Sequence, residues 1–235
     1  MAKTAALPKY VQVSEMLIRD IAAGHLVDGA KLPPERDMAD ELDVAIGTLR
    51  KALADVESKG MLARVQGSGS YIRHQTVVDS VYAFFRLELL RGGGLPTAEV
   101  LSVDRLPKPA EFPPFGADVE GHRIRRLRFL DGQVIALEEI WLDGECRDVI
   151  SAEDLSESLY HFYRHDLGIV IAAAEDRVGL ATVPDWTPAG FHLPAGQVTG
   201  FIDRIGRTAV TTAVEYSRTW FDADRARYVS RMGKG

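Results

Sequence analysis

Several features that would indicate a secreted, membrane-bound or metal-dependent protein are missing from this sequence. It contains one cysteine, Cys146, so a single chain can form neither an internal disulfide nor a metal site built from cysteines. It has no run of about eighteen apolar residues, the length that a membrane helix needs. Its first ten residues, MAKTAALPKY, lack the apolar core of a signal peptide. We therefore expect a cytoplasmic protein that makes no membrane contact.

The sequence also lacks the excess of positive charge that is typical of nucleic-acid-binding proteins. Its formal net charge is −6, from 28 lysines and arginines against 34 aspartates and glutamates. The imbalance is uneven: residues 1–75 carry ten of each, whereas the rest of the chain carries eighteen basic and twenty-four acidic residues. The neutral N-terminal part is still compatible with salt-sensitive DNA binding. The acidic remainder makes a poor DNA surface.

Internal repeats of 20–50 residues and low-complexity tracts are absent as well, which argues against a solenoid or a disordered chain. At 235 residues, of which 46% are hydrophobic, the chain is long enough for two modest domains with real cores. The residue pattern changes after Gln75, from helical spacing to the alternation that is typical of strands. We predict two domains, residues 1–75 and residues 76–235.

The most informative stretch runs from Leu32 to Ile72, and it predicts two helices followed by a hairpin. Pro34 is favoured at the first position of a helix and opens the first one. After a short break at 43–45, the second helix directs its leucines inward and ends at Lys59-Gly60. Its outward residues are Thr48, Arg50 and Lys51.

The hairpin has strands at 61–65 and 70–72, joined by the turn Gln66-Gly67-Ser68-Gly69. Helix, tight turn, helix and basic-edged hairpin together predict a winged helix-turn-helix, a module that reads DNA. The glycine turn could also be taken for a phosphate-binding loop. It lacks the strand, lysine and helix context that such loops require. The remaining alternative is two ordinary helices with solvated charges.

An earlier helix is predicted between Pro8 and Gly24, because apolar residues recur there at helical spacing. We expect this helix to contribute to the core of the first domain. Lys9 and Tyr10, at its start, are candidate phosphate contacts.

Residues 32–72 resemble the GntR family of bacterial transcription regulators. The resemblance rests on three elements in one order: Leu32-Pro33-Pro34-Glu35-Arg36, Thr48-Leu49-Arg50-Lys51-Ala52-Leu53 and Gly67-Ser68-Gly69. It implies that the helix arginines approach bases or phosphates and that the hairpin approaches the minor groove or the backbone. With the other candidates, the expected DNA contacts are Lys9, Tyr10, Arg36, Thr48, Arg50, Lys51, Gln66, Gly67, Ser68 and Gly69.

The chain departs from the family pattern at Ala45-Ile46, where the family usually has Ser-Arg. The missing serine weakens the helix N-cap, by about 1 kcal/mol for a typical cap. The missing arginine removes a base or phosphate contact. We therefore expect an operator that differs from the common family half-site.

The second domain is predicted to be rich in strands. Asp131-Gly132 is a strong hairpin signal, and Gly206-Arg207 is expected to play the same part near the end of the chain. A helix is expected over 155–167. The candidate strands are 98–106, 123–130, 134–142, 169–180, 198–205 and 211–221.

Residues 78–233 resemble the UTRA effector-binding domain of the HutC branch of GntR regulators. The matching motifs are Arg126-Leu127-Arg128, Asp131-Gly132, Ala136-Leu137-Glu138, Ser158-Leu159-Tyr160 and Val214-Glu215-Tyr216-Ser217. The resemblance implies a mainly antiparallel sheet with helices, similar to chorismate lyase. With the first domain, this makes an α+β protein.

Strand alternation places Arg126 and Arg128 on one face of their strand, with large apolar residues on the opposite face. Two arginines on one face can hold a carboxylate or phosphate. Glu138 and Glu215 can accept hydrogen bonds from hydroxyl or ammonium groups. The alternative is solvated cross-strand ion pairs of little energetic weight. By resemblance, the expected effector-binding residues are Arg126, Arg128, Glu138, Ser158, Tyr160, Glu215 and Phe221.

The class of effector follows from one more departure. Many sugar-phosphate sensors have a serine or threonine before a phenylalanine in the first loop of this domain, where this chain has Ala83 in Val81-Tyr82-Ala83-Phe84. We therefore expect a small carboxylate or amino-acid-like anion. His161 and His165 have the spacing of helical zinc ligands, but no acidic residue or third ligand accompanies them. No metal or cofactor is expected.

These predictions describe a transcriptional regulator that binds double-stranded DNA as a homodimer, on an inverted-repeat operator, under the control of a small anionic metabolite. We expect a repressor, although activators share these parts and the sequence does not show the sign of control. One alternative is a lyase- or hydrolase-like enzyme with Glu138, Glu139 or Glu215 as general base. The sequence shows no nucleophile–base pair, metal set or cofactor fingerprint for it. Another alternative, a nucleoid-type DNA binder, leaves the arginine–glutamate face without a role.

Overall fold

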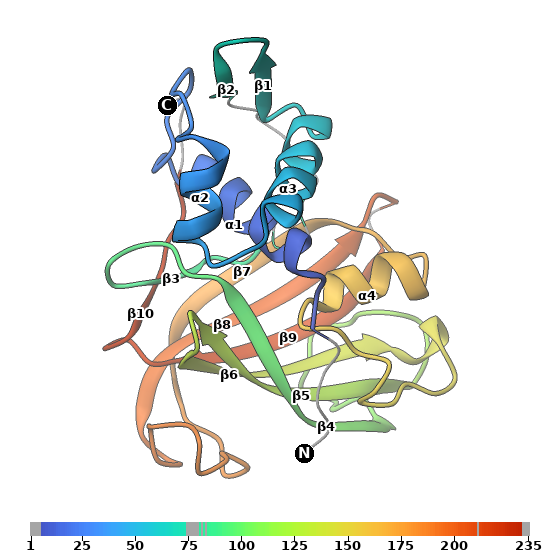
Figure 1. Cartoon of the computed structure of the whole chain (residues 1–235). Coiled ribbons are helices and arrows are strands. Elements are labelled where there is room, and N and C mark those ends of the chain that lie inside the picture. The colour runs from blue at the N-terminus through green and yellow to red at the C-terminus, as the bar shows by residue number, and fades with distance from the viewer. Residues whose placement is uncertain (1–5, 74–79, 81, 83, 211, 232–235) are drawn as a thin grey trace. The chain divides into compact units, whose positions relative to one another are not determined.

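The computed structural model describes residues 6–73, 80, 82, 84–210 and 212–231. The chain folds into two compact units, coloured by residue number in Figure 1. The first unit, called the head below, consists mainly of Leu7–Arg86. The second, called the sheet unit, consists mainly of Pro96–Tyr228 together with Leu87–Leu90.

The head contains the predicted winged helix-turn-helix. Its helices are α1 (Lys9–Ala22), α2 (Glu35–Glu41) and α3 (Ile46–Ser58). Its hairpin pairs β1 (Leu62–Val65) with β2 (Gly69–Ile72). Pro34 precedes α2 as its N-cap residue, and Ala45 precedes α3 without a side-chain cap hydrogen bond.

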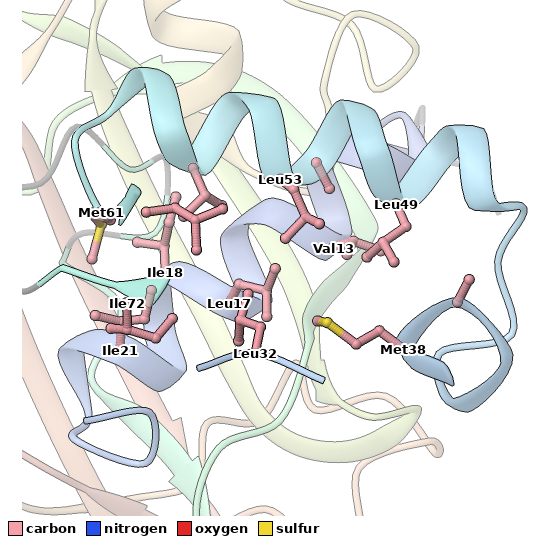
Figure 2. Packing of buried hydrophobic residues seen from close by; sticks show 14 residues of the cluster. Val13, Leu17, Ile18, Ile21, Leu32, Met38, Leu49, Leu53, Met61 and Ile72 are labelled. Atoms are coloured by element: carbon pink, nitrogen blue, oxygen red, sulfur yellow. The ribbon is translucent and has the colours of Figure 1, made fainter. Parts of the chain in front are cut away.

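The head is held together by one apolar core to which all three helices and the hairpin contribute. Figure 2 shows Leu49 and Leu53 of α3 directed toward Val13 and Leu17 of α1. Leu49 is completely buried, and burying a leucine side chain typically contributes about 1.5–3 kcal/mol. These contacts all lie within the head, so packing inside the head holds α3 in place.

The sheet unit is built on a six-stranded antiparallel sheet with the order β4-β5-β6-β9-β8-β7. A separate two-stranded antiparallel sheet pairs β3 (Leu87–Leu89), which precedes the main strands in sequence, with β10 (Ala226–Tyr228), which follows them. The main strands are β4 (Pro96–Pro107), β5 (Glu120–Leu130), β6 (Gln133–Asp143), β7 (Ile171–Thr182), β8 (Val198–Thr208) and β9 (Ala213–Phe221).

The β5–β6 hairpin turns at Asp131-Gly132 as predicted, with both residues at positive φ (47° and 73°). The second predicted turn, Gly206-Arg207, is wrong, because β8 continues to Thr208. Gly206 serves a different purpose: a Cβ atom there would lie 3.3 Å from Cβ of Glu215 on the neighbouring strand. The glycine makes room for a side chain across the sheet.

Helix α4 (Leu159–Asp166) is shorter than the predicted helix over 155–167. It begins after Ser158, whose side-chain oxygen accepts a hydrogen bond from the backbone N–H of His161, at 3.3 Å. A serine in this position satisfies one of the unpaired N–H groups of the first turn and therefore sets the start of the helix.

The two faces of the sheet are covered differently. Trp141, Tyr216 and Trp220 lie on one face and pack against Phe112, Phe115, Val183 and Phe191, which belong to long loops. Loops, and not helices, therefore supply the aromatic cover of this face. The opposite face, called the charged face below, carries Arg126, Glu138 and Glu215 and contacts α4 (Figure 1).

Candidate DNA-reading surface and effector site

The outer surface of α3 carries the predicted DNA contacts of the head. Arg50 and Lys51 are exposed and Thr48 is half-buried, because Leu49 and Leu53 turn the opposite side of the helix into the core. Nε of Arg50 donates a hydrogen bond of 2.7 Å to Glu35 at the start of α2. This pair orients the guanidinium group while its side chain stays 60% exposed.

Other predicted DNA contacts are also exposed. Arg36 lies in the first turn of α2, and Lys9 and Tyr10 lie at the start of α1. In the hairpin turn, Gln66, Gly67 and Gly69 are exposed, whereas Ser68 is half-buried with its hydroxyl 2.6 Å from that of Tyr71.

Sequence reasoning missed one cation in this region. Lys31 forms an isolated β-bridge with Tyr71, and a Cβ atom at Gly69 would lie 3.0 Å from its side-chain Cε. This places a positive charge against the tip of the hairpin. Neither periodicity nor a motif signals that position, because it depends on a bridge between distant segments.

The charged face of the sheet begins with Arg126 and Arg128 on β5. The register pairs Arg126 with Glu138 on β6, and Nη2 of Arg126 donates a hydrogen bond of 2.6 Å to Oε2 of Glu138. Arg128 is 3.5 Å from the other carboxylate oxygen. Both guanidinium groups also donate to the backbone carbonyl of Glu157, at 3.3 and 3.0 Å.

All three of these side chains are buried, so they are not the solvated pairs of the alternative interpretation. Burial alone raises the pKa of Glu138. The positive charges of Arg128 and Arg126 outweigh that effect and hold the pKa below its usual value. Glu138 is therefore a carboxylate that the two arginines keep ionised.

Glu215 on β9 is the second buried carboxyl on this face, and it has a different environment. Its neighbour is the hydroxyl of Tyr160 on α4, which donates a hydrogen bond of 3.1 Å to Oε1. Burial raises the pKa of Glu215, and it raises the pKa of Tyr160 as well. The face thus holds one glutamate whose pKa the arginines lower and one whose pKa burial raises.

Arg204 on β8 is an unpredicted member of this cluster. It pairs with Asp176 on β7 through two hydrogen bonds, 2.5 Å from Nε and 2.7 Å from Nη2. Tyr228 donates a further hydrogen bond of 2.8 Å to Asp176. The alternation of residues 198–205 does not by itself tell on which face of the sheet Arg204 lies. The register with the neighbouring strands decides this.

The remaining predicted effector residues line the same region. The ring of Phe221 lies over Gly200, where a Cβ atom would be 2.3 Å from it. Ser158 is buried as the cap of α4. The fold therefore brings Arg126, Arg128, Glu138, Glu215 and Phe221 to one face, with Ser158 and Tyr160 at the start of the covering helix. Val81 and Ala83, like the linker residues 74–79, lie outside the described residues.

Glu139, the third candidate general base, points to the other face. It accepts hydrogen bonds from Arg125 (2.8 Å), Arg218 (2.5 Å) and the indole of Trp141 (3.2 Å). Burial raises its pKa, but the arginine hydrogen bonds and charges outweigh this and lower it. A carboxylate held in this way is a weak base and a structural partner.

The other titratable candidates form no metal site among the described residues, where no group of three or more potential ligands gathers. His161 and His165 stack with ring centroids 4.0 Å apart, and burial, followed by the charge of His165, lowers the pKa of His161. Burial raises the pKa of the Cys146 thiol to about 11. None of the described helices is long and apolar enough to cross a membrane.

Comparison with known proteins adds two family matches. Residues 9–72 match the family of bacterial regulatory proteins called gntR, and residues 91–227 match the UTRA domain. The chain is 56% identical over 227 residues to the HTH-type transcriptional regulator SmoD of Agrobacterium fabrum, covering 97% of each chain.

More distant relatives agree with this assignment. The mannosyl-D-glycerate transport/metabolism system repressor MngR of Escherichia coli is 26% identical, with 92% of each chain covered. The crystal structure of the possible transcriptional regulator YydK from Bacillus subtilis has a TM-score of 0.54 and 21% identity, and covers 97% of this chain and all of its own. At that identity the structural likeness supports the fold alone.

The two buried glutamates provide a matched test of the charged face. We expect Glu138→Gln to destabilise the sheet unit by about 3–5 kcal/mol, because it leaves two buried arginines without their carboxylate. Glu215→Gln should cost less, because the amide removes a charge that burial disfavours and can still accept the hydrogen bond from Tyr160. Urea unfolding at several pH values measures both changes.

The pH dependence should separate the two residues further. The lowered pKa of Glu138 stabilises the fold at pH values above the unfolded pKa of about 4.3, so the cost of Glu138→Gln should be constant from pH 8 to pH 5. The pKa of Glu215 is raised, so ionisation of this residue destabilises the wild type as the pH rises. The stability of Glu215→Gln relative to the wild type should therefore increase with pH. Equal costs for both variants would contradict this assignment.

Proposed function

Because the chain belongs to the GntR family of bacterial transcription regulators and carries the UTRA domain of its HutC branch, we propose that it is a cytoplasmic, metabolite-controlled repressor. It binds an inverted-repeat operator as a homodimer and releases it when a small anion binds the charged face of the sheet unit. The observation that carries this proposal is the buried arginine cluster of that face. Residues 1–75 serve as the DNA-binding domain, and residues 76–235 as the effector-binding and dimerisation domain.

DNA recognition is assigned to α3 and the hairpin. Winged helix-turn-helix proteins insert the second helix of the motif into the major groove. Arg50, oriented by Glu35, is the best-placed base contact, and Lys31 beside the hairpin tip adds a phosphate contact. The predicted contacts Arg36, Thr48, Lys51 and Gln66 to Gly69 surround them.

The arginines of the sheet face favour an anionic effector. Arg126, Arg128 and Arg204 are brought together there, each paired with a carboxylate of its own chain. Burial raises the pKa of Glu215 beside them, so its surroundings disfavour an additional negative charge on the protein. An anion that binds these guanidinium groups would form charge-assisted hydrogen bonds away from water.

The chemical class that we propose is a small carboxylate with hydroxyl or amino groups. Glu215 and Tyr160 offer hydrogen-bonding partners for such groups beside the arginines. MngR is named as the repressor of a transport and metabolism system for mannosyl-D-glycerate, which is a carboxylate that bears hydroxyls.

The effector signal needs a route to the head, and the segment after the hairpin offers one. The hydroxyl of Ser80 donates a hydrogen bond to the buried carboxylate of Glu15 on α1. The same carboxylate accepts a hydrogen bond of 3.3 Å from Lys59, the residue that ends α3. Glu15 therefore links the chain that leaves the head to the end of the DNA-reading helix.

Aromatic contacts reinforce this attachment. Tyr82 is buried against Leu7, and Phe85 packs edge-on against Tyr82. Arg19 of α1 stacks over Phe85 at 4.9 Å and donates a hydrogen bond of 3.3 Å to its carbonyl. We propose that effector binding strains or releases this attachment and so shifts the head away from its DNA-competent arrangement.

The enzyme alternative is not supported. The match to a GntR head and a UTRA domain is the architecture of a regulator family. Glu139 is ion-paired on the opposite face from the other two glutamates. The UTRA match equally disfavours a DNA binder without an effector.

The DNA-binding proposal is tested with Arg50→Ala on duplexes that tile the region upstream of the gene. Fluorescence anisotropy at several salt concentrations should show saturable, salt-sensitive binding of the wild type to one duplex. The variant should lose about 1–3 kcal/mol of binding free energy, because it loses a base contact. Arg147→Ala, a charge removal in the sheet unit, is the control and should bind normally. Equal binding by Arg50→Ala would contradict the assignment of α3.

The effector proposal is tested with Arg126→Lys, which keeps the charge but loses the bidentate geometry. We expect normal operator binding and at least a tenfold higher effector concentration for release, equivalent to about 1.4 kcal/mol. Isothermal titration with hydroxy and amino carboxylates identifies the ligand. Tight binding of a hexosamine phosphate, with none of the carboxylates, would overturn the proposed class.

The signal route is tested with Ser80→Ala. This change removes the hydrogen bond to Glu15 while both binding surfaces remain. We expect effector binding within about twofold of the wild type, yet a clearly weaker effect of effector on operator affinity. Ser58→Ala, an exposed serine of α3, is the control. Full release by the Ser80 variant would contradict the route.

A further inference from the structure

The first turn of α3 carries an apolar side chain that the core of the head does not enclose. Ile46, the first residue of the helix, is 41% exposed. The helix contributes to the core through its other side, with Leu49, Ala52, Leu53 and Val56. A single exposed apolar side chain is common on protein surfaces, so its neighbours decide what it can contact.

The next residue, Gly47, is a second feature that the fold of the head does not require. Its backbone is helical, and a glycine inside a helix is less favourable than an alanine. Among the described residues, a Cβ atom at Gly47 would meet no atom of another segment within 4 Å. Packing within the chain therefore does not demand a glycine. The open space beside Ile46 allows another molecule to approach the helix backbone closely.

Positive charge flanks this turn on the exposed side of α3. Arg50 follows Ile46 by four positions and Lys51 follows Gly47 by four, so each pair lies side by side on the helix. Both basic side chains are exposed, and residues 46–54 include no acidic residue. A polyanion is the partner that matches an apolar tip, a backbone that can be closely approached and two cations on one side of a helix.

We propose that Ile46 selects the operator sequence by packing against the 5-methyl group of a thymine. The inference rests on the proposed function, in which α3 enters the major groove of an operator. In helix-turn-helix proteins the N-terminal residues of that helix contact the base edges. Thymine is the standard base that presents a methyl group in the major groove, and apolar side chains recognise it there.

The position of that thymine follows from the helix. It faces the first turn of α3, one turn away from the base that Arg50 contacts. In an inverted repeat, each half-site holds one such thymine, because two-fold symmetry presents the same side chain to both. Gly47 leaves the space in which the base edge comes against Ile46.

The size of the effect follows from the burial of one methyl group. Its removal should weaken binding about fourfold, the equivalent of about 0.8 kcal/mol. Contributions from well-separated positions are roughly additive. Removal of the two symmetric methyl groups of an inverted repeat should therefore weaken binding of the dimer about fifteenfold.

The test replaces thymine by deoxyuridine, which lacks the 5-methyl group and still pairs with adenine. The probe is the upstream duplex that the full-length wild type binds saturably, and symmetric pairs of thymines are replaced one pair at a time. Fluorescence anisotropy measures the affinity for each duplex. We expect one pair to reduce wild-type affinity about fifteenfold.

Ile46→Ala should bind the unmodified duplex more weakly than the wild type does. At the sensitive pair, deoxyuridine should change its affinity less than about twofold, because the side chain that contacts the methyl group is gone. Alanine is favourable in a helix, and circular dichroism confirms folding. Val27→Ala is the matched control, since it shortens another exposed apolar side chain of the head, and it should keep the full deoxyuridine effect.

Gly47→Ala tests the close approach separately from the methyl contact. Alanine favours the helix, so this variant should unfold at a higher temperature than the wild type. It should nevertheless lose operator affinity, because its added methyl group fills the space beside Ile46. A more stable variant that binds the operator as tightly as the wild type would contradict the proposed approach of a base to this turn.

The outcomes separate this inference from the proposed function. Saturable wild-type binding that no deoxyuridine substitution weakens would overturn the thymine contact and leave the repressor proposal in place. An equal deoxyuridine effect in the wild type and in Ile46→Ala would show that another residue contacts the methyl group, and would also overturn the inference alone. Binding of the wild type to none of the upstream duplexes would overturn the proposed function, and the inference with it.

Discussion

The structure of the sheet unit depends on the compensation of buried charge. Arg126 and Arg128 lie where water cannot solvate them, and an uncompensated ion in that position would cost several kcal/mol. Glu138 and the carbonyl of Glu157 provide the compensation, so the arginines fix the segment that precedes α4 as well as the neighbouring strand. The helix that covers the site is thus positioned by the same groups that are proposed to bind the effector.

This coupling gives the site a means of responding to a ligand. An anion that binds the arginines competes with Glu138 and with the Glu157 carbonyl, and it therefore acts on contacts that hold the covering segment. The apolar face of the sheet, packed with aromatic residues from two loops, is separate from this competition. The aromatic packing of the sheet and the contacts that a ligand would change therefore lie on opposite faces.

The head shows the same division on a smaller scale. Its apolar core holds α3 against α1 and leaves the polar side of α3 to DNA. The carboxylate of Glu15 is a buried polar group beside that apolar interior, and its partners are the end of α3 and the segment after the hairpin. A buried polar group that joins two elements is sensitive to their relative movement, which is what a signal between domains requires.

The sequence by itself determined the local features: the helices of the head, the turn at Asp131-Gly132, and the alternation that places Arg126, Arg128 and Glu138 on shared faces. These follow from periods of 3.6 and 2 residues and from turn chemistry, all of which act over short distances. Tertiary structure decided the role of Gly206, the membership of Arg204 in the charged cluster, and the partnership of Glu15 with Ser80. Each of these depends on which distant segment lies alongside, and only strand register and packing establish that.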